Sequence, residues 1–358
     1  MCRIYNSIGC LKTIKLSLEQ NKIYDFSSIK EIINFRNSYQ STINQLINVH
    51  EKLIEEEKSQ LMAELSNLAK VIEIKREESK QQILTEIHFL KEKVKSHTDK
   101  IASNFFNRVE TRFTNWNINR KIKGKENSLE IEVDISVSEL SKQQKQKSNR
   151  LNFLGSNFDK AVKKSAGNIL LELERKKSVI DSLNNSIYGA IGEHKVVKAL
   201  EKLSDDYYLI NDFVASFSPA IYNRQENDYI KSVQIDHILV GPSGLFLIET
   251  KNWSEKSLES LNLRSPVDQI RRMNFAIFNI LNNERSSYHI RLNNHHWGNK
   301  KIPIKNLVVL TNAKPKEDFQ HVKILTVNEL IGYVNYFKPI FSSQEIKQIV
   351  DMLLWLQD

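Results

Sequence analysis

The feature that most constrains this chain is a stretch of about ninety residues, 29–120, that contains neither proline nor glycine. Apolar side chains recur along it at three- and four-residue spacing, as at Leu61, Leu65, Leu68 and Ile72, which predicts one apolar side on a helix. At about 1.5 Å per residue, ninety helical residues would span on the order of 135 Å. A helix of that length needs a partner, either a returning helix of the same chain or another subunit.

The region that follows changes its pattern twice before residue 185. Residues 121–127 are polar and contain Gly124, which is typical of a turn, and residues 129–137 alternate apolar and acidic or polar side chains, which is typical of a strand. Residues 139–188 return to helical spacing. We therefore expect residues 1–185 to form an all-α coiled-coil arm or helical hairpin, interrupted by a short strand at 129–137.

The second half has the pattern of a layered α/β domain. Helical spacing at 186–203, 265–283 and 343–357 alternates with apolar runs typical of strands. These runs are 207–213, 234–240, 245–251, 306–311 and 322–327. Residues 214–232 are polar and predicted to be irregular. The expected fold is an α/β domain over 186–358, with a sheet covered by helices on both faces.

Charge and cysteine content narrow the classes of protein. The net charge of +9 lies mostly in residues 1–185, which hold 32 Lys and Arg against 24 Asp and Glu. This excess is what a nucleic-acid contact needs, and a solvated helical surface explains it equally well. Two cysteines, Cys2 and Cys10, form no disulfide framework or zinc motif and indicate a reducing cytoplasm. No signal peptide or membrane-spanning run is predicted.

The register of one predicted hairpin decides where its charged residues lie. A four-residue loop at 241–244 pairs Val240 with Leu245, and Pro242 argues against a primed two-residue turn, which needs positive φ at that position. In this register Asp236 lies opposite Glu249. A slip of one residue would send Asp236 to the other face of the sheet.

The same register gathers Asp236, Glu249 and Lys251 on one face at the open end of the hairpin. Opposed carboxylates repel unless a cation lies between them, and Mg²⁺ prefers such oxygen ligands. Lys251 could then activate water or stabilise charge on a phosphate during phosphodiester hydrolysis. A salt-bridge cluster at the end of a sheet explains the spacing equally well.

Four motifs in this order resemble the nuclease-related domain, NERD, a family with the PD-(D/E)XK restriction-endonuclease-like fold. They lie at 189–193 (GAIGE), 234–237 (QIDH), 244–253 (GLFLIETKNW) and 266–269 (PVDQ). The resemblance covers about residues 186–312. It implies a restriction-endonuclease-like mixed sheet flanked by helices. The chain departs from the family at 254–262, where a glycine-containing turn is common and no glycine is present.

The resemblance also implies a role for each matching residue. Asp236 and Glu249 would be ligands of Mg²⁺ or Mn²⁺, with the main-chain carbonyl of Thr250 as a third ligand and Lys251 as the catalytic lysine. Two further catalytic candidates lie on the flanking helices, Glu193 and Gln269. Glu193 would hold a second metal or orient Lys251, and Gln269 would face the site, although each also fits an ordinary helix position. Gly189 and Gly192 are expected to permit close helix-to-sheet packing.

Three functions follow from these patterns. The first is a cytoplasmic, metal-dependent deoxyribonuclease whose arm serves oligomerisation or target sensing, with RNA not excluded as substrate and a context in DNA processing or phage defence. The second is a scaffold or sensor that uses the nuclease-like domain for docking to a partner protein. The third is a basic coiled coil that binds nucleic acid. The complete set of Asp236, Glu249 and Lys251 favours the first.

Overall fold

The computed structural model describes residues 1–99, 105–253, 264–282, 301–312, 314–315 and 317–357. The chain divides into two compact units. The sheet unit comprises residues 1–36 and 175–358, and the helical arm comprises residues 37–174. Within the parts just given, no helix is long and apolar enough to cross a membrane.

The sheet unit contains a six-stranded mixed sheet with strands in the order β1-β2-β3-β4-β5-β6. The strands are β1 (Arg3–Tyr5), β2 (Tyr208–Asn223), β3 (Asp228–Gly241), β4 (Gly244–Lys251), β5 (Ile304–Leu310) and β6 (Lys323–Thr326). The pairs β2/β3 and β3/β4 are antiparallel, whereas β1/β2, β4/β5 and β5/β6 are parallel. Every side chain of β4 except that of Lys251 is buried, as a strand covered on both faces requires.

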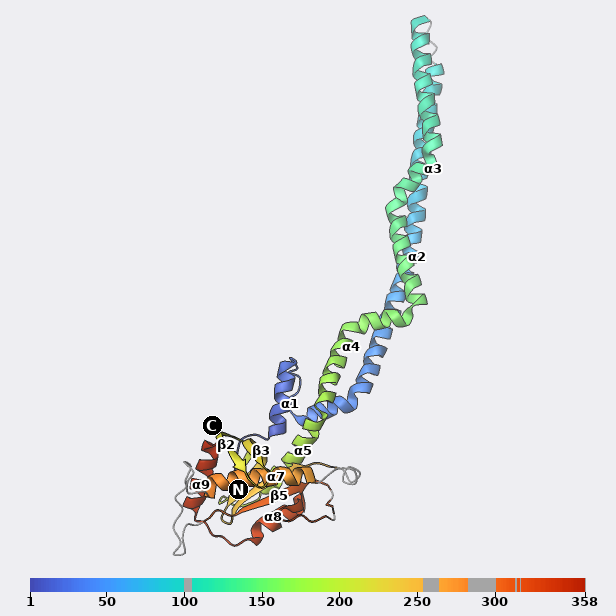
Figure 1. Cartoon of the computed structure of the whole chain (residues 1–358). Helices are drawn as coiled ribbons and strands as arrows, with labels where there is room; N and C mark the ends of the chain where they lie inside the picture. The colour runs from blue at the N-terminus through green and yellow to red at the C-terminus, as the bar shows by residue number, and fades with distance from the viewer. Residues whose placement is uncertain (100–104, 254–263, 283–300, 313, 316, 358) are drawn as a thin grey trace. The chain divides into compact units, whose positions relative to one another are not determined.

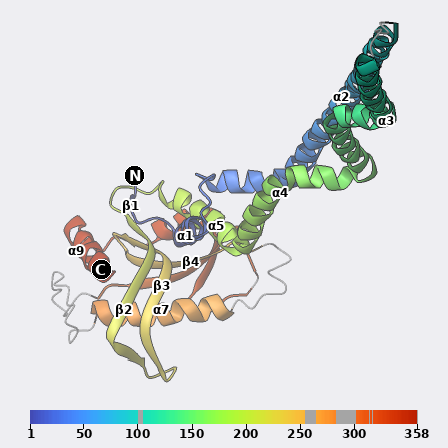
Figure 2. The same ribbon diagram turned by 90° about the horizontal axis from the view of Figure 1, so that it is seen from above.

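Helices cover both faces of this sheet (Figures 1 and 2). Helices α7 (Arg264–Asn282) and α9 (Ser343–Trp355) pack on one face. Helices α1 (Gly9–Gln20), α5 (Asn184–Leu200) and α8 (Val327–Tyr336) pack on the other. The predicted α/β class, with a mixed sheet flanked by helices, is confirmed. Helix α8 was not predicted, and its Thr326–Glu329 capping box is the signal that marks its start.

Residues 214–232 were predicted to be irregular, but most of them belong to a long hairpin. Strands β2 and β3 continue through this region and are connected by a turn at 224–227 (Figure 2). Apolar residues on the two strands, such as Ala215, Ile230 and Val233, are buried in the core while most of their neighbours are exposed. The many polar residues on the solvent side hid this alternation, which a register shift between Ser216 and Ile221 further disturbs.

The helical arm is an antiparallel hairpin of two long helices followed by a third. Its helices are α2 (Ile29–Asp99), which begins in the sheet unit, α3 (Phe105–Ser156) and α4 (Phe158–Ser182). Helix α3 returns along α2 (Figure 1), so the partner that the long helix requires is supplied by the same chain. Their shared core contains Ile83, Ile87, Ile118, Ile122 and Val133. Ion pairs such as Lys91–Glu126 and Arg76–Asp134 lie at the same level of the arm.

The predicted turn at 121–127 and strand at 129–137 are both wrong, because α3 is helical throughout this region. A pattern with an apolar residue at every second position also has an apolar residue at every fourth position, and residues four apart lie on the same side of a helix. Val133 and Val137 are buried, and Leu129 is half-buried against the arm core, as helical spacing requires. Ile131 and Ile135 project outward with exposed fractions of 61% and 65%. The apolar stripe of α2 thus selected the helix over the strand.

The first 36 residues belong to the sheet unit, not to the arm with which they were predicted. Strand β1 pairs in parallel with β2, and α1 packs beside α5. Three residues of strand and a twelve-residue helix carry too little pattern to show their partner. Through this packing, Cys10 of α1 lies beside Glu193 of α5.

Candidate active site

The β3/β4 hairpin has the predicted register. Val240 lies opposite Leu245 and His237 opposite Ile248, so the next position places Asp236 against Glu249. Gly241 also pairs with Gly244, which leaves a two-residue connection, tighter than the predicted four-residue loop. Gly244 has φ of +115°, and a side chain there would also collide with the Pro303 carbonyl.

A hydrogen bond joins the Asp236 carboxylate to the neighbouring strand, β4. Its Oδ2 accepts a hydrogen bond of 2.7 Å from the main-chain N–H of Thr250. Burial raises the pKa of Asp236, while the Thr250 N–H and the Lys251 cation act in the opposite direction. The Asp236 side chain thus lies at the Glu249-Thr250-Lys251 segment and remains partly exposed.

Glu249 and Lys251 form a direct ion pair. The Lys251 Nζ donates a hydrogen bond of 2.7 Å to Oε1 of Glu249, and their side chains are 27% and 2% exposed, respectively. The second oxygen, Oε2, is buried and has no hydrogen-bond partner among the described residues. Burial, followed by the Asp236 charge, raises the pKa of Glu249 to about 7. Burial opposes the charge on Lys251, but Glu249 outweighs this effect and raises the pKa of Lys251. One lysine therefore faces two carboxylates.

Glu193 reaches the same region from α5. Its side chain is buried, and burial raises its pKa to about 7. A hydrogen bond with Cys10 lowers this pKa, and the Asp236 charge raises it. Its Oε2 also lacks a partner. The Cys10 thiol, which sequence reasoning did not place here, lies so close to α5 that a Cβ on Gly189 would be 2.6 Å from its Sγ.

Gly192 sets the distance between α5 and the end of β4. A Cβ at this position would lie 2.9 Å from the Cβ of Asn252 and 3.4 Å from Cγ2 of Thr250. Any larger residue would push the helix away from the strand that carries Glu249 and Lys251. The predicted close helix-to-sheet packing is confirmed for Gly192, whereas Gly189 packs against Cys10 of α1 and not against the sheet.

A further carboxylate, that of Asp212, lies beside the site and was not predicted from the sequence. It occupies β2 between Asn211, which pairs with His237, and Phe213, which pairs with Ile235. Its φ is +47°, and its carboxylate accepts hydrogen bonds from Lys12 at 2.8 Å and Gln234 at 3.0 Å. Its charge helps to raise the pKa of Asp236. The available signal was an aspartate inside an apolar strand, a position that burial makes unfavourable without a partner.

Gln269 does not lie with the other predicted site residues. The side chain of Gln269 is exposed on α7, and no contact in the described residues joins it to Asp236, Glu249 or Lys251, so its role stays a prediction. The Oγ1 of Thr250 is buried without a partner. Residues 254–262, where the chain departs from the family, lie outside the described residues.

The site offers oxygen ligands for a cation, but not a complete ligand shell of side chains. No group of three or more His, Cys, Asp or Glu side chains arranged to hold a metal occurs in the part of the chain that the structure describes. Asp236 and Glu249 supply two carboxylates. The unpartnered Glu249 Oε2 and the raised pKa values are what a missing positive charge would produce. The donor set therefore fits a hard divalent cation bound by two carboxylates, main-chain oxygen and water.

In the comparisons with known proteins, one segment of the chain matches a family model. Residues 188–311 match the family model of NERD, the nuclease-related domain. This match confirms the resemblance found in the sequence. The NERD segment covers a little over a third of the chain and contains Glu193, Asp236, Glu249, Lys251 and Gln269. No curated protein and no solved structure matches the chain.

A large groove of the sheet unit lies away from these residues. It has a volume of about 1240 Å³ and borders α7, the β2/β3 turn and the β6 edge. Arg271, Arg272 and Lys305 contribute to its lining, together with Asp228 and Asp268. None of the predicted site residues lines this groove, and its mixed charge does not identify a ligand.

Proposed function

We propose that this chain is a metal-dependent nuclease that hydrolyses phosphodiester bonds of DNA, with its active site at Asp236, Glu249 and Lys251. The nuclease-related domain supports hydrolysis of nucleic acid as the general activity. The observation that carries the metal-dependent mechanism is the buried, unpartnered Oε2 of Glu249 beside the Asp236 carboxylate. Among the residues that the structure describes, Lys251 is the one lysine paired with these two acids, and an unpaired buried charge is strongly unfavourable.

Each residue has a task that follows from its position. Asp236 and Glu249 would hold Mg²⁺ or Mn²⁺, with the main-chain carbonyl of Thr250 as a further ligand. A bound divalent cation would polarise the scissile phosphate and lower the pKa of bound water. The Thr250 N–H orients Asp236 and leaves its Oδ1 for this purpose.

Lys251 is the group that would act on the substrate. Its Nζ carries a proton, is held by Glu249, and keeps 27% of the side chain exposed. The charged amino group of Lys251 would orient the attacking water and stabilise negative charge on the phosphate oxygens in the transition state. Glu193 would position these groups through its charge, since it is buried beside Cys10 and close enough to Asp236 for their charges to repel.

A cleavage assay tests the proposal. The purified chain is incubated with supercoiled plasmid, linear duplex DNA, single-stranded DNA and RNA, in Mg²⁺, Mn²⁺ or EDTA. The site variant is Asp236→Ala/Lys251→Ala. The matched control is Glu226→Ala/Lys231→Ala, which also removes one acid and one lysine, both exposed on the β2/β3 hairpin. We expect metal-dependent cleavage of DNA that the site variant loses and the control retains.

Two results would reject the proposal. Cleavage that persists in EDTA would exclude the metal, and cleavage retained by the site variant would exclude this site. RNA as the only substrate would replace DNA in the assignment. A direct titration with Mn²⁺ followed by electron paramagnetic resonance provides a second measurement, since Glu249→Gln should weaken binding even if no cleavage substrate is found.

A further inference from the structure

One face of α3 is apolar although it points away from α2. Residues Ile118, Ile122 and Val133 of this helix are buried in the arm core. A second set follows the opposite side at three- and four-residue steps or their multiples, and we name it the outer face of α3. It consists of Val109, Phe113, Trp116, Gly124, Ile131 and Ile135.

The exposure of this face is large for its residue types. Phe113 and Trp116 are 64% and 57% exposed, and their rings lie 6.0 Å apart. Ile131 and Ile135 are 61% and 65% exposed. Single exposed apolar residues are common, but aromatic and aliphatic residues in one row on one helix are typical of an interaction surface.

The apolar residues are arranged symmetrically about Gly124. Phe113 and Ile135 each lie eleven residues from it, and Trp116 and Ile131 lie eight and seven residues from it. If two α3 helices pack antiparallel with a twofold axis at Gly124, each aromatic residue of one copy meets an isoleucine of the other. An interface between identical chains related by a twofold axis must be self-complementary in this way.

The charges follow the same axis with opposite signs. Residues 109–125 contain five Lys and Arg and one Glu, whereas residues 126–140 contain five Asp and Glu and no Lys or Arg. Antiparallel packing places the basic half of one helix beside the acidic half of the other. Parallel packing would place like charges together, which is unfavourable.

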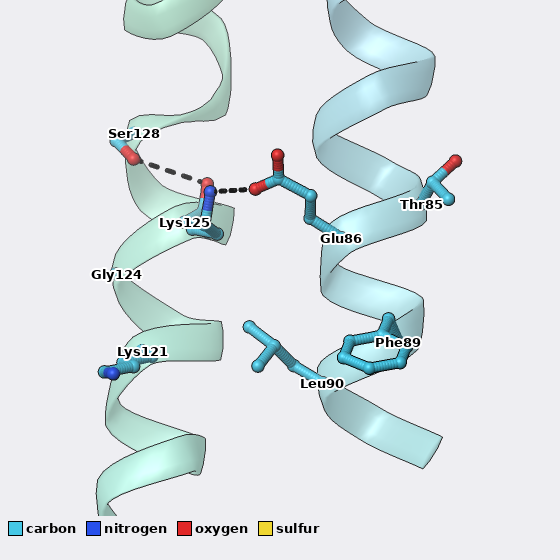
Figure 3. A pocket seen from close by; sticks show the side chains of 8 residues that line it. All are labelled: Thr85, Glu86, Phe89, Leu90, Lys121, Gly124, Lys125 and Ser128. Carbon is cyan, nitrogen blue, oxygen red and sulfur yellow. Dashed lines mark hydrogen bonds and ion pairs between the residues drawn. The ribbon is translucent and has the colours of Figure 1, made fainter. Parts of the chain in front are cut away.

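Gly124 leaves room at the proposed axis. No atom lies within 4 Å of a Cβ built on it, so packing inside the arm does not require glycine there, and glycine weakens a helix interior. An apolar groove of about 860 Å³ lies between α2 and α3 at this level and is lined by Gly124, Phe89 and Leu90, of which Leu90 points toward α3 (Figure 3). The side chain of Phe89 is 68% exposed. The backbone of a second α3 helix can therefore approach closely at Gly124, next to the apolar side chains that line the groove.

We propose that a second copy of this chain packs antiparallel against the outer face of α3, with the twofold axis at Gly124. The interface joins the arms of two chains. It is independent of whether the NERD domain cleaves nucleic acid. The self-complementary order of both apolar and charged residues is the reason to name a second copy, not another protein, as the occupant.

Sedimentation of the full chain tests the interface. We expect a dimer at micromolar concentration. Ile131→Lys/Ile135→Lys should weaken it by roughly 10⁴-fold, since the two substitutions in each of two chains remove four buried isoleucines and each contributes roughly a factor of ten. The matched control is Val71→Lys/Ile74→Lys, which adds the same charge at exposed apolar positions of α2. A monomeric wild type, or equal loss in the control, would overturn the proposal.

Cysteine cross-linking tests the direction of packing. A mixture of Arg120→Cys and Asn127→Cys chains should form a disulfide-linked pair under mild oxidation, because these positions face each other across the axis. Arg120→Cys alone should not, since its two copies lie about 12 Å apart along the helix. Linkage of Arg120→Cys alone, or none in the mixture, would overturn antiparallel packing. Wild type reports any linkage through Cys2 or Cys10, and Gly155→Cys on the same helix should remain unlinked.

Discussion

Replacing Glu249 by glutamine should stabilise the metal-free protein at pH 8, although it removes half of an ion pair. Glutamine has the shape of protonated glutamate and carries no charge. The ionised carboxylate is unfavourable in this position because burial and the Asp236 charge outweigh the attraction of Lys251, and they raise its pKa from 4.5 to about 7. The raised pKa therefore indicates that the charged form of Glu249 is unfavourable in the folded chain.

The magnitude follows from proton linkage. A group whose pKa is raised by folding binds more protons in the folded state, so stability is full below pH 4.5 and decreases as pH rises to about 7. Each pKa unit corresponds to about 1.4 kcal/mol, and the rise to about 7 therefore amounts to on the order of 3 kcal/mol. Glu249→Gln should match wild type near pH 4.5 and exceed its free energy of unfolding by this amount at pH 8.

Urea unfolding in EDTA at both pH values measures this difference. Tryptophan fluorescence is the probe, in a Trp116→Phe background, because the other three tryptophans all belong to the sheet unit. Mg²⁺ at pH 8 should then stabilise wild type and have little effect on the glutamine variant. A variant that is less stable than wild type at pH 8 without metal would refute the reasoning, since it would show that Lys251 dominates the site.

Three other predictions test the site and the arm. Lys251→Ala should lower the cleavage rate at least about 100-fold while Mn²⁺ binding at pH 8 persists, as rate measurements and a metal titration would show. Gly192→Ala should destabilise the sheet unit by about 1–3 kcal/mol through the 2.9 Å contact with Asn252, whereas Gly167→Ala, which meets no atom within 4 Å, should not. Ile87→Ala should destabilise the arm by about 2–5 kcal/mol in helical melts, and the more exposed Leu84→Ala by much less.

The site residues on β3 and β4 could be predicted from the sequence because they depend on short-range rules. A short loop sets the register of a hairpin, and alternation along a strand then places Glu249 and Lys251 on one face. The pairing of Val240 with Leu245 followed from these rules and is confirmed. The family motifs added Glu193, whose helix the sequence also predicted.

The surroundings of the site could not be predicted in this way. Cys10 lies beside Glu193 because α1 packs on α5, and Asp212 lies next to Asp236 because β2 pairs with β3. Both contacts join segments that are distant in the chain, and neither segment carries a local signal for its partner. They nevertheless act on the carboxylates: the Asp212 charge raises the pKa of Asp236, whereas the hydrogen bond with Cys10 lowers the pKa of Glu193.

The sequence by itself determined that the first half is rich in long helices and that a paired set of carboxylates and a lysine lies at the end of a hairpin. Only the tertiary structure decided the conformation of residues 129–137. Their alternation suits a strand as well as one side of a helix, and local propensity does not choose between them. Packing against α2 favours the helix, because a returning helix buries Val133 and Val137 against the apolar stripe of α2. A lone strand would instead leave its own backbone groups unpaired.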